Sequence, residues 1–113
     1  MTTRIIANIV ASDTQYDEKA PFTTYTIAVQ AYESGGSPQT ARSWTLSRRY
    51  SQFRQLRAAL LADADARRGA LVRRLPFPPR RLLDTHTSAT ISERRAKLGE
   101  FLHALVELSL IHI

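Results

Sequence analysis

The sequence predicts an α+β domain in which a three-stranded antiparallel sheet packs on a helical subdomain with a proline-rich arm. In the first half of the chain apolar and polar residues alternate with a period of two, which is typical of half-buried strands. After residue 50 apolar residues recur every three or four positions, the period of a helix. A chain of 113 residues without internal repeats or a linker indicates one domain.

Three segments of the first half are predicted to be strands. Residues 4–10 are apolar and β-branched, residues 22–32 alternate, and residues 41–47 form a short third strand after the turn-forming SGGSP at 34–38. Short connections between consecutive strands favour an antiparallel meander. The side of the second strand expected to face the core comprises Thr23, Tyr25, Ile27, Val29 and Ala31.

Two helices are predicted in the second half, on either side of a proline-rich segment. The first begins at Tyr50 and extends to about Ala66, because Phe53 and the leucines after it have helical spacing. Residues 73–81, RRLPFPPRR, should be extended and polyproline-like, since proline fixes φ and lacks a backbone donor. The last helix is expected to begin at Thr90, where Thr90 and Glu93 fit a capping box. Its apolar stripe comprises Leu98, Phe101, Leu102 and Leu105.

Composition excludes several classes of protein. There is no cysteine, so neither a disulfide framework nor thiolate chemistry is expected. No apolar run approaches the roughly 20 residues of a membrane span, and the N-terminus does not resemble a signal peptide, so a cytoplasmic protein is expected. The three histidines have no zinc-type spacing, and Asp63 and Asp65 are expected on different faces of a helix. The sequence therefore predicts no enzyme, no metal and no cofactor.

Arginine is unevenly distributed along the chain. Residues 1–41 carry two basic and four acidic side chains, whereas residues 42–113 carry fourteen basic and six acidic ones. Arginine presents a planar fork of donors that suits phosphate and carboxylate, so an anionic partner is indicated. Three arginine pairs lie where predicted elements begin or end, namely Arg48-Arg49, Arg80-Arg81 and Arg94-Arg95. Each pair by itself is also compatible with a solvated basic surface.

The prolines allow a second interpretation. Arg73-x-x-Pro76-x-x-Pro79 matches one orientation of a Src-homology-3 ligand, and Pro76-x-x-Pro79-x-Arg81 matches the other. This pattern would give a protein-interaction module that uses the Pro76–Pro79 arm or the sheet surface. Nucleic-acid binding is a weaker third interpretation, because no reading motif accompanies the arginines.

Four segments resemble the phox-homology (PX) domain family. RRYSQFRQL at 48–56 is similar to its arginine–tyrosine signature, and LPFPPRRLL at 75–83 to its proline-rich arm. ISERRAKLGEFLHALV at 91–106 resembles its following helix, and PFTTYTIAV at 21–29 its second strand. The four matches occur in the family's order.

The resemblance implies a phosphoinositide-binding pocket between the sheet and the helices. By position, Arg49 would hold a 3-phosphate, Tyr50 would lie under the inositol ring, and Arg80 would meet the 1-phosphate. Arg94 would bond the ring hydroxyls on the far side, while Arg48 and Arg81 are secondary candidates. Arg80 replaces the lysine usual in the family, which differs in reach and geometry.

The resemblance also implies a non-catalytic membrane-targeting module. Its ligand would most often be phosphatidylinositol 3-phosphate, and its location would be peripheral, on endosomal or vacuolar membranes, as in sorting nexins. The family usually continues past its long helix into a further short helix, whereas this sequence ends at ELSLIHI. A single domain over residues 1–113 that lacks the final helix is therefore expected.

Overall fold

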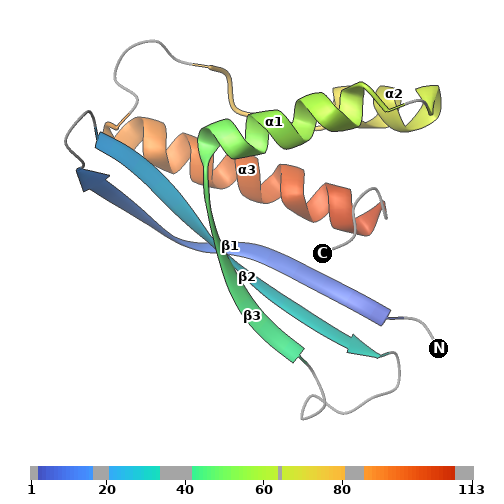
Figure 1. Cartoon of the computed structure of the whole chain (residues 1–113), viewed down its shortest axis with the longest axis horizontal. Helices are drawn as coiled ribbons and strands as arrows, with labels where there is room; N and C mark the ends of the chain where they lie inside the picture. The colour runs from blue at the N-terminus through green and yellow to red at the C-terminus, as the bar shows by residue number, and fades with distance from the viewer. Residues whose placement is uncertain (1–2, 17–20, 34–41, 64, 81–85, 109–113) are drawn as a thin grey trace.

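The computed structural model describes residues 3–16, 21–33, 42–63, 65–80 and 86–108. The element order is β1 (Thr3–Tyr16), β2 (Pro21–Glu33), β3 (Arg42–Arg49), α1 (Tyr50–Leu61), α2 (Ala66–Arg74) and α3 (Ser88–Glu107). The helices lie on one side of the sheet (Figure 1), which confirms the predicted α+β class. Within these ranges no helix is both long and apolar enough to cross a bilayer.

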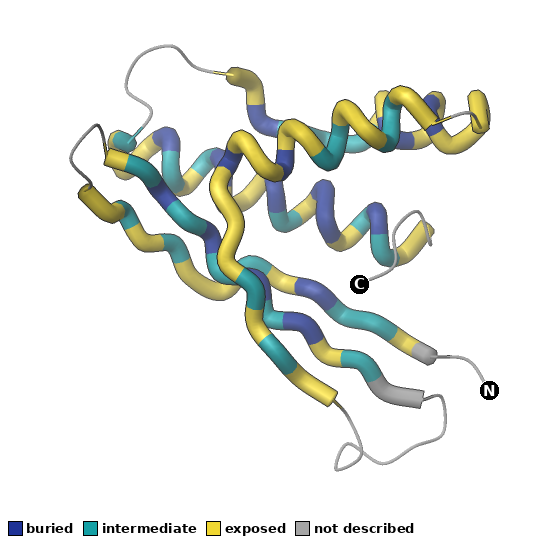
Figure 2. Tube along the Cα trace, in the orientation of Figure 1, coloured by how far each residue is buried: buried dark blue, intermediate teal, exposed yellow. Residues whose placement is uncertain are grey.

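The sheet is the predicted antiparallel meander, with strand order β1-β2-β3. The strands extend beyond the predicted bounds, since β1 continues to Tyr16 and β3 to Arg49. Along β2 the expected inward positions Thr23, Tyr25, Ile27 and Val29 are buried, and this alternation is visible in Figure 2. The register of β1 shifts between Ile9 and Ala11, so Val10 lies in a β-bulge.

The predicted long helix after residue 50 is two helices. The sequence indicated one helix to about Ala66, but α1 ends at Leu61 and α2 begins at Ala66. The reason is aspartate capping: the Asp65 carboxylate accepts hydrogen bonds from the backbone N–H groups of Arg67 and Arg68. Asp63 Oδ1 accepts from the N–H of Asp65 at 2.9 Å, which stabilises the turn.

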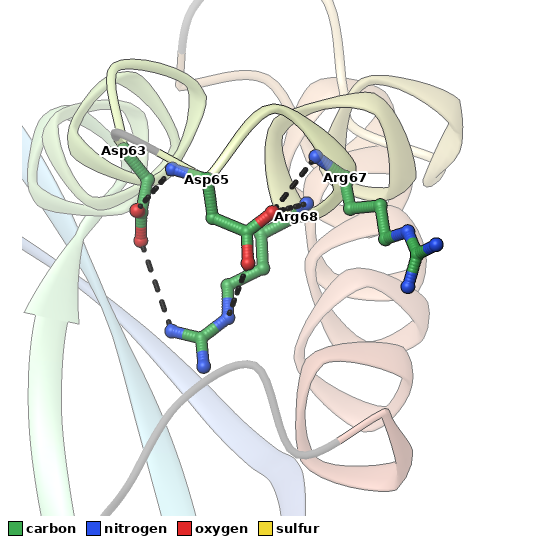
Figure 3. Close-up of polar contacts among 4 residues, drawn as sticks. All are labelled: Asp63, Asp65, Arg67 and Arg68. Atoms are coloured by element: carbon green, nitrogen blue, oxygen red, sulfur yellow. Dashed lines mark hydrogen bonds and ion pairs between the residues drawn. The ribbon is translucent and has the colours of Figure 1, made fainter.

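The two aspartates are therefore neighbours rather than residues on opposite helix faces, and that expectation was wrong. Figure 3 shows the Arg68 side chain between their carboxylates, with nitrogen–oxygen separations of 3.9 Å to Asp63 and 3.8 Å to Asp65. All three side chains are substantially exposed, so these ion pairs add little stability, and the caps contribute more.

The last helix begins earlier than predicted. Its N-cap is Thr87, whose hydroxyl accepts from the Thr90 N–H at 3.2 Å, and the helix starts at Ser88. The capping-box assignment to Thr90 and Glu93 was wrong, because both lie within the helix. The Arg95 guanidinium on α3 donates to the carbonyl of Val10 at 2.8 Å. That contact joins the helix to the β-bulge of β1, so Arg95 has a structural partner.

Two apolar clusters form the core, and Phe77 contacts both of them. The first cluster lies between sheet and helices, and the second lies among the helices. Figure 2 shows the buried positions of α1 and α3 on their facing sides. The first comprises Ala7, Tyr25, Ile27, Val29, Tyr50, Phe53, Leu98 and Leu102. The second comprises Val72, Phe101 and Leu105.

The proline segment packs against the body of the domain. Arg73 and Arg74 belong to α2, so the extended segment begins at Leu75 rather than at residue 73. Pro78 is fully buried, and its carbonyl accepts a hydrogen bond from the Tyr50 hydroxyl at 2.7 Å. The prolines of the predicted Src-homology-3 motifs are Pro76, which is half-buried, and Pro79, which is exposed, while Arg73 is helical, so that interpretation stays a prediction. The expectation that the family's final short helix is lacking concerns the end of the chain. Residues 109–113 lie outside the described ranges, so it stays a prediction.

Candidate anion-binding cleft

One cleft gathers all four residues expected to bind the ligand. The beginnings of β2 and α3 lie at the same end of the molecule (Figure 1), and residues from these two segments and from the beginning of α1 line a cleft of about 250 Å³. Its lining residues are Pro21, Phe22, Thr23, Arg49, Tyr50, Ser51, Arg54, Arg80, His86 and Arg94. Among the described residues this lining includes four arginines and no carboxylate, so the cleft suits an anion.

Arg94 is the most buried cation of the cleft. Its side chain is only 7% exposed, although it lies in the second turn of α3. The guanidinium carbon lies 3.8 Å from the centre of the Tyr50 ring, a close cation–π contact. Its Nε makes no hydrogen bond within the described residues. Burying a charged donor without a partner costs free energy, and the cation–π contact with Tyr50 offsets part of that cost.

Tyr50 holds the Arg94 guanidinium and the proline segment in place. Its hydroxyl donates to the Pro78 carbonyl, and its ring lies 5.8 Å from that of Phe77, tilted by 31°. With Arg94 on the ring as well, Tyr50 is only 9% exposed. Its first role in this structure is to position Arg94 and the proline segment. The predicted contact with an inositol ring stays a prediction and concerns only the part of Tyr50 left exposed.

Two buried tyrosines remain neutral near the cleft. Burial raises the pKa of Tyr50, while the charges of Arg94, Arg54, Arg57 and Arg80 oppose the rise. Burial likewise raises the pKa of Tyr25, with Arg94 opposing. A raised tyrosine pKa means that the contribution to stability is present below about pH 10 and is lost as the pH rises through the folded-state value. The Tyr50–Pro78 hydrogen bond therefore persists at physiological pH.

Arg48 and Arg49 differ as expected from strand alternation. Arg49 pairs with Thr24 and Arg48 with Tyr25, so the two side chains leave opposite faces of β3. The Arg49 guanidinium lies 4.7 Å from the centre of the Phe22 ring and lines the cleft. Arg48 donates to the Ser47 carbonyl at 2.8 Å and is not among the lining residues.

Arg80 lines the cleft from the end of the proline segment, and its side chain is exposed. Arg80 also borders a second hollow of about 330 Å³ between α1 and residues 77–80, together with Arg54 and Arg57. The other secondary candidate, Arg81, lies outside the described residues.

Six of the ten lining residues were not predicted as site residues, and three of them have side chains of particular interest, namely Phe22, Arg54 and His86. Arg54 follows Tyr50 by one helical turn, so its i, i+4 spacing was a usable signal. Phe22 and His86 are brought in from β2 and from the residues before α3, and nothing local in the sequence indicates this. Among the residues that the structure describes, no three histidine or acidic side chains are grouped as metal ligands.

These features define a small α+β domain with an arginine-lined cleft where sheet and helices meet. A family model described as PX domain matches residues 36–112, well over half of the chain. The chain belongs to the PX domain family, whose members are generally phosphoinositide-binding modules. No curated protein matches it.

Solved PX domains have the same fold. The mouse SNX19 PX domain has 22% sequence identity and a TM-score of 0.68, and the match covers 97% of this chain and 89% of that one. The structure of the same domain with a bound sulphate ion has 22% identity and a TM-score of 0.67, and the match covers 94% of this chain and 86% of that one. A designed CISK-PX domain has 22% identity and a TM-score of 0.65, and the match covers 90% of this chain and 84% of that one.

Changes at Tyr50 should separate the ring from the hydroxyl. Tyr50→Phe is expected to destabilise the domain by about 1–3 kcal/mol, because the buried Pro78 carbonyl loses its donor. Its affinity for 3-phosphoinositide liposomes should change little, since the ring under Arg94 remains. Tyr50→Ala should weaken lipid binding much more. Liposome titration and urea denaturation of both variants test this, and equal affinities for folded Tyr50→Phe and Tyr50→Ala would exclude the ring's role.

Proposed function

We propose that this domain is a non-catalytic module that binds phosphatidylinositol 3-phosphate and thereby targets its protein to membranes. The observation that supports this most is the convergence of Arg49, Arg80 and Arg94, distant in sequence, on one cleft beside Tyr50. Arginine can bind a phosphate through two parallel charge-assisted hydrogen bonds. Two or more phosphates on a compact ring would engage several of these guanidiniums at once.

The proposed roles follow the geometry of the cleft. Arg49 and Phe22 lie on the β2–β3 side, Arg80 at the end of the proline segment, and Arg94 on Tyr50. We assign the 3-phosphate to Arg49, the 1-phosphate to Arg80, and the ring hydroxyls to Arg94. Arg94 can donate to a hydroxyl acceptor without moving into solvent. A sulphate ion bound to the solved mouse SNX19 PX domain adds support for anion binding by this fold.

The proposed location is peripheral, on the cytoplasmic face of endosomal or vacuolar membranes. The basic half of the chain would add attraction to the anionic leaflet, worth about 1 kcal/mol for each arginine near the surface. That attraction is independent of the lipid isomer, so it cannot supply selectivity. Selectivity has to come from the cleft.

The test is liposome co-sedimentation across the phosphoinositide isomers. Binding is expected to be strongest for phosphatidylinositol 3-phosphate and at least tenfold weaker for the 4- and 5-phosphate isomers of equal charge, because a misplaced phosphate loses one bidentate contact. Phosphatidylserine liposomes of matched surface charge are the control. Equal retention on every isomer would show that the arginines form only a basic surface.

A further inference from the structure

His86 has a position that its sequence context does not explain. It immediately precedes Thr87, the N-cap of α3, and it is half-buried and lines the same cleft as Arg54 of α1 and Arg80 of the proline segment. A histidine at the start of a helix is usually a surface residue. Here three segments far apart in sequence, at residues 21–23, 49–54 and 80, surround it.

The contacts of His86 fix one ring nitrogen and leave the other available. Nδ1 lies 3.1 Å from Thr23 Oγ1, and Thr23 Oγ1 lies 2.9 Å from Thr14 Oγ1. Thr23 is only 6% exposed, so this chain of hydroxyls is held by the sheet. Nε2 makes no hydrogen bond with the described residues.

The threonine pair can serve both protonation states of the imidazole. A hydroxyl rotates and can donate or accept, so Thr23 can donate to a neutral Nδ1 and can accept from Nδ1–H of the cation. The second hydroxyl, on Thr14, completes either pattern. Protonation of His86 therefore requires no rearrangement of the fold.

The charges around His86 couple its protonation to ligand binding. Among the described residues, the charged and titratable groups that line the cleft with it are Arg49, Tyr50, Arg54, Arg80 and Arg94, from β3, α1, the proline segment and α3. β1 and β2 contribute Thr14 and Thr23, which do not titrate. The four guanidiniums attract a phosphorylated headgroup into the cleft, next to the imidazole of His86. A bound phosphate would place negative charge beside the imidazole, where the described lining residues include no carboxylate, and nearby negative charge favours the protonated form of a histidine.

We propose that His86 is a further ligand-binding residue of the cleft, and that its protonation makes the binding of a phosphorylated headgroup stronger as the pH falls. This inference rests on the proposed function. Nε2–H of the imidazolium is the donor offered to a phosphate oxygen, while Nδ1–H is held by Thr23. Histidine is the side chain whose ordinary titration falls between pH 5 and 8, so the effect belongs to that range.

The experiment measures binding of the whole chain to phosphatidylcholine vesicles containing phosphatidylinositol 3-phosphate at pH 6 and pH 8. For each protein the affinity at pH 6 is divided by the affinity at pH 8. The ratio for the wild type, divided by the ratio for His86→Asn, should be about five to ten, which corresponds to a rise in the pKa of His86 of up to about one unit on ligand binding. Asparagine can keep the contact with Thr23 but cannot be protonated. Division by the variant removes the titration of the lipid phosphate, which acts in the opposite direction.

Two further measurements distinguish a ligand contact from a structural histidine. His103 is exposed on α3, so His103→Asn should retain the wild-type pH dependence. In the wild type, NMR titration of the His86 ring should show its midpoint rising when soluble inositol 1,3-bisphosphate is added. This readout requires no variant, so it holds even where His86→Asn fails to fold.

The outcomes separate the two proposals. Selectivity for the 3-phosphate at neutral pH, with no midpoint shift and identical pH ratios for wild type and His86→Asn, overturns the role of His86 and keeps the proposed function. A midpoint shift and a pH dependence lost in His86→Asn, with all phosphoinositide isomers bound equally, support His86 and overturn the preference for phosphatidylinositol 3-phosphate.

Discussion

Arg49→Gln is expected to lower the affinity for liposomes containing phosphatidylinositol 3-phosphate at least tenfold. Arg49 lines the cleft with its guanidinium over Phe22, and the proposed contact with phosphate is charge-assisted, each such bond contributing about 1.5–3 kcal/mol. Since 1.4 kcal/mol corresponds to a factor of ten, the loss of one bond is enough. Glutamine keeps an amide donor but removes the charge and the fork.

Arg48→Gln is the matched control for this prediction. It removes the same charge from the neighbouring position, but Arg48 leaves the other face of β3 and does not line the cleft. Only its attraction to the anionic leaflet is lost, about 1 kcal/mol, so the affinity should fall a few-fold. Liposome titrations at matched ionic strength, with circular dichroism to check folding, compare the two. Equal small losses would mean that the double arginine acts as a solvated charge pair.

Phe101→Ala is expected to destabilise the domain by about 3–5 kcal/mol. Phe101 is fully buried, and its ring meets that of Phe77 edge to face at a centroid distance of 4.9 Å. Because Phe77 contacts both apolar clusters and also Tyr50, a cavity at residue 101 removes support beneath the cleft as well as within the helices. Domains of this size are stable by about 5–15 kcal/mol, so the loss is a large fraction of the total.

The control is another large apolar residue of a helix. Leu71 on α2 is 41% exposed, so Leu71→Ala should cost less than about 1 kcal/mol. Urea denaturation at equilibrium measures both variants, with similar m-values expected for each. A loss below about 1 kcal/mol for Phe101→Ala would show that the helical cluster is not a stabilising core.

The binding prediction from sequence depended on four motifs, and the structure brings their residues to one cleft. Arg49, Tyr50, Arg80 and Arg94 could be named because the motifs that contain them resemble those of the PX family. Arg54 could have been added from its spacing of one turn after Tyr50. His86 could not, because its place in the cleft depends on a contact with Thr23, 63 residues earlier in the chain.

The sequence by itself determined the α+β class, the order of the strands and the residues that face the core along β2. These follow from hydrophobic periodicity, which is a local pattern that can be read from the residues of each segment alone. It did not determine where α1 ends or where α3 begins. The N-caps are Asp65 and Thr87, and other aspartate and threonine residues nearby in the sequence could have capped a helix equally well.

Only the tertiary structure decided how the arginines divide their roles. Arg94 and Arg95 are adjacent in sequence, yet Arg94 is buried against Tyr50 in the cleft, while Arg95 binds the carbonyl of the β-bulge at Val10. Tyr50 likewise supports Arg94 and Pro78 before it can contact any ligand. Such roles depend on which segments meet after folding, and contacts between residues 28 to 85 positions apart leave no periodic pattern in the chain.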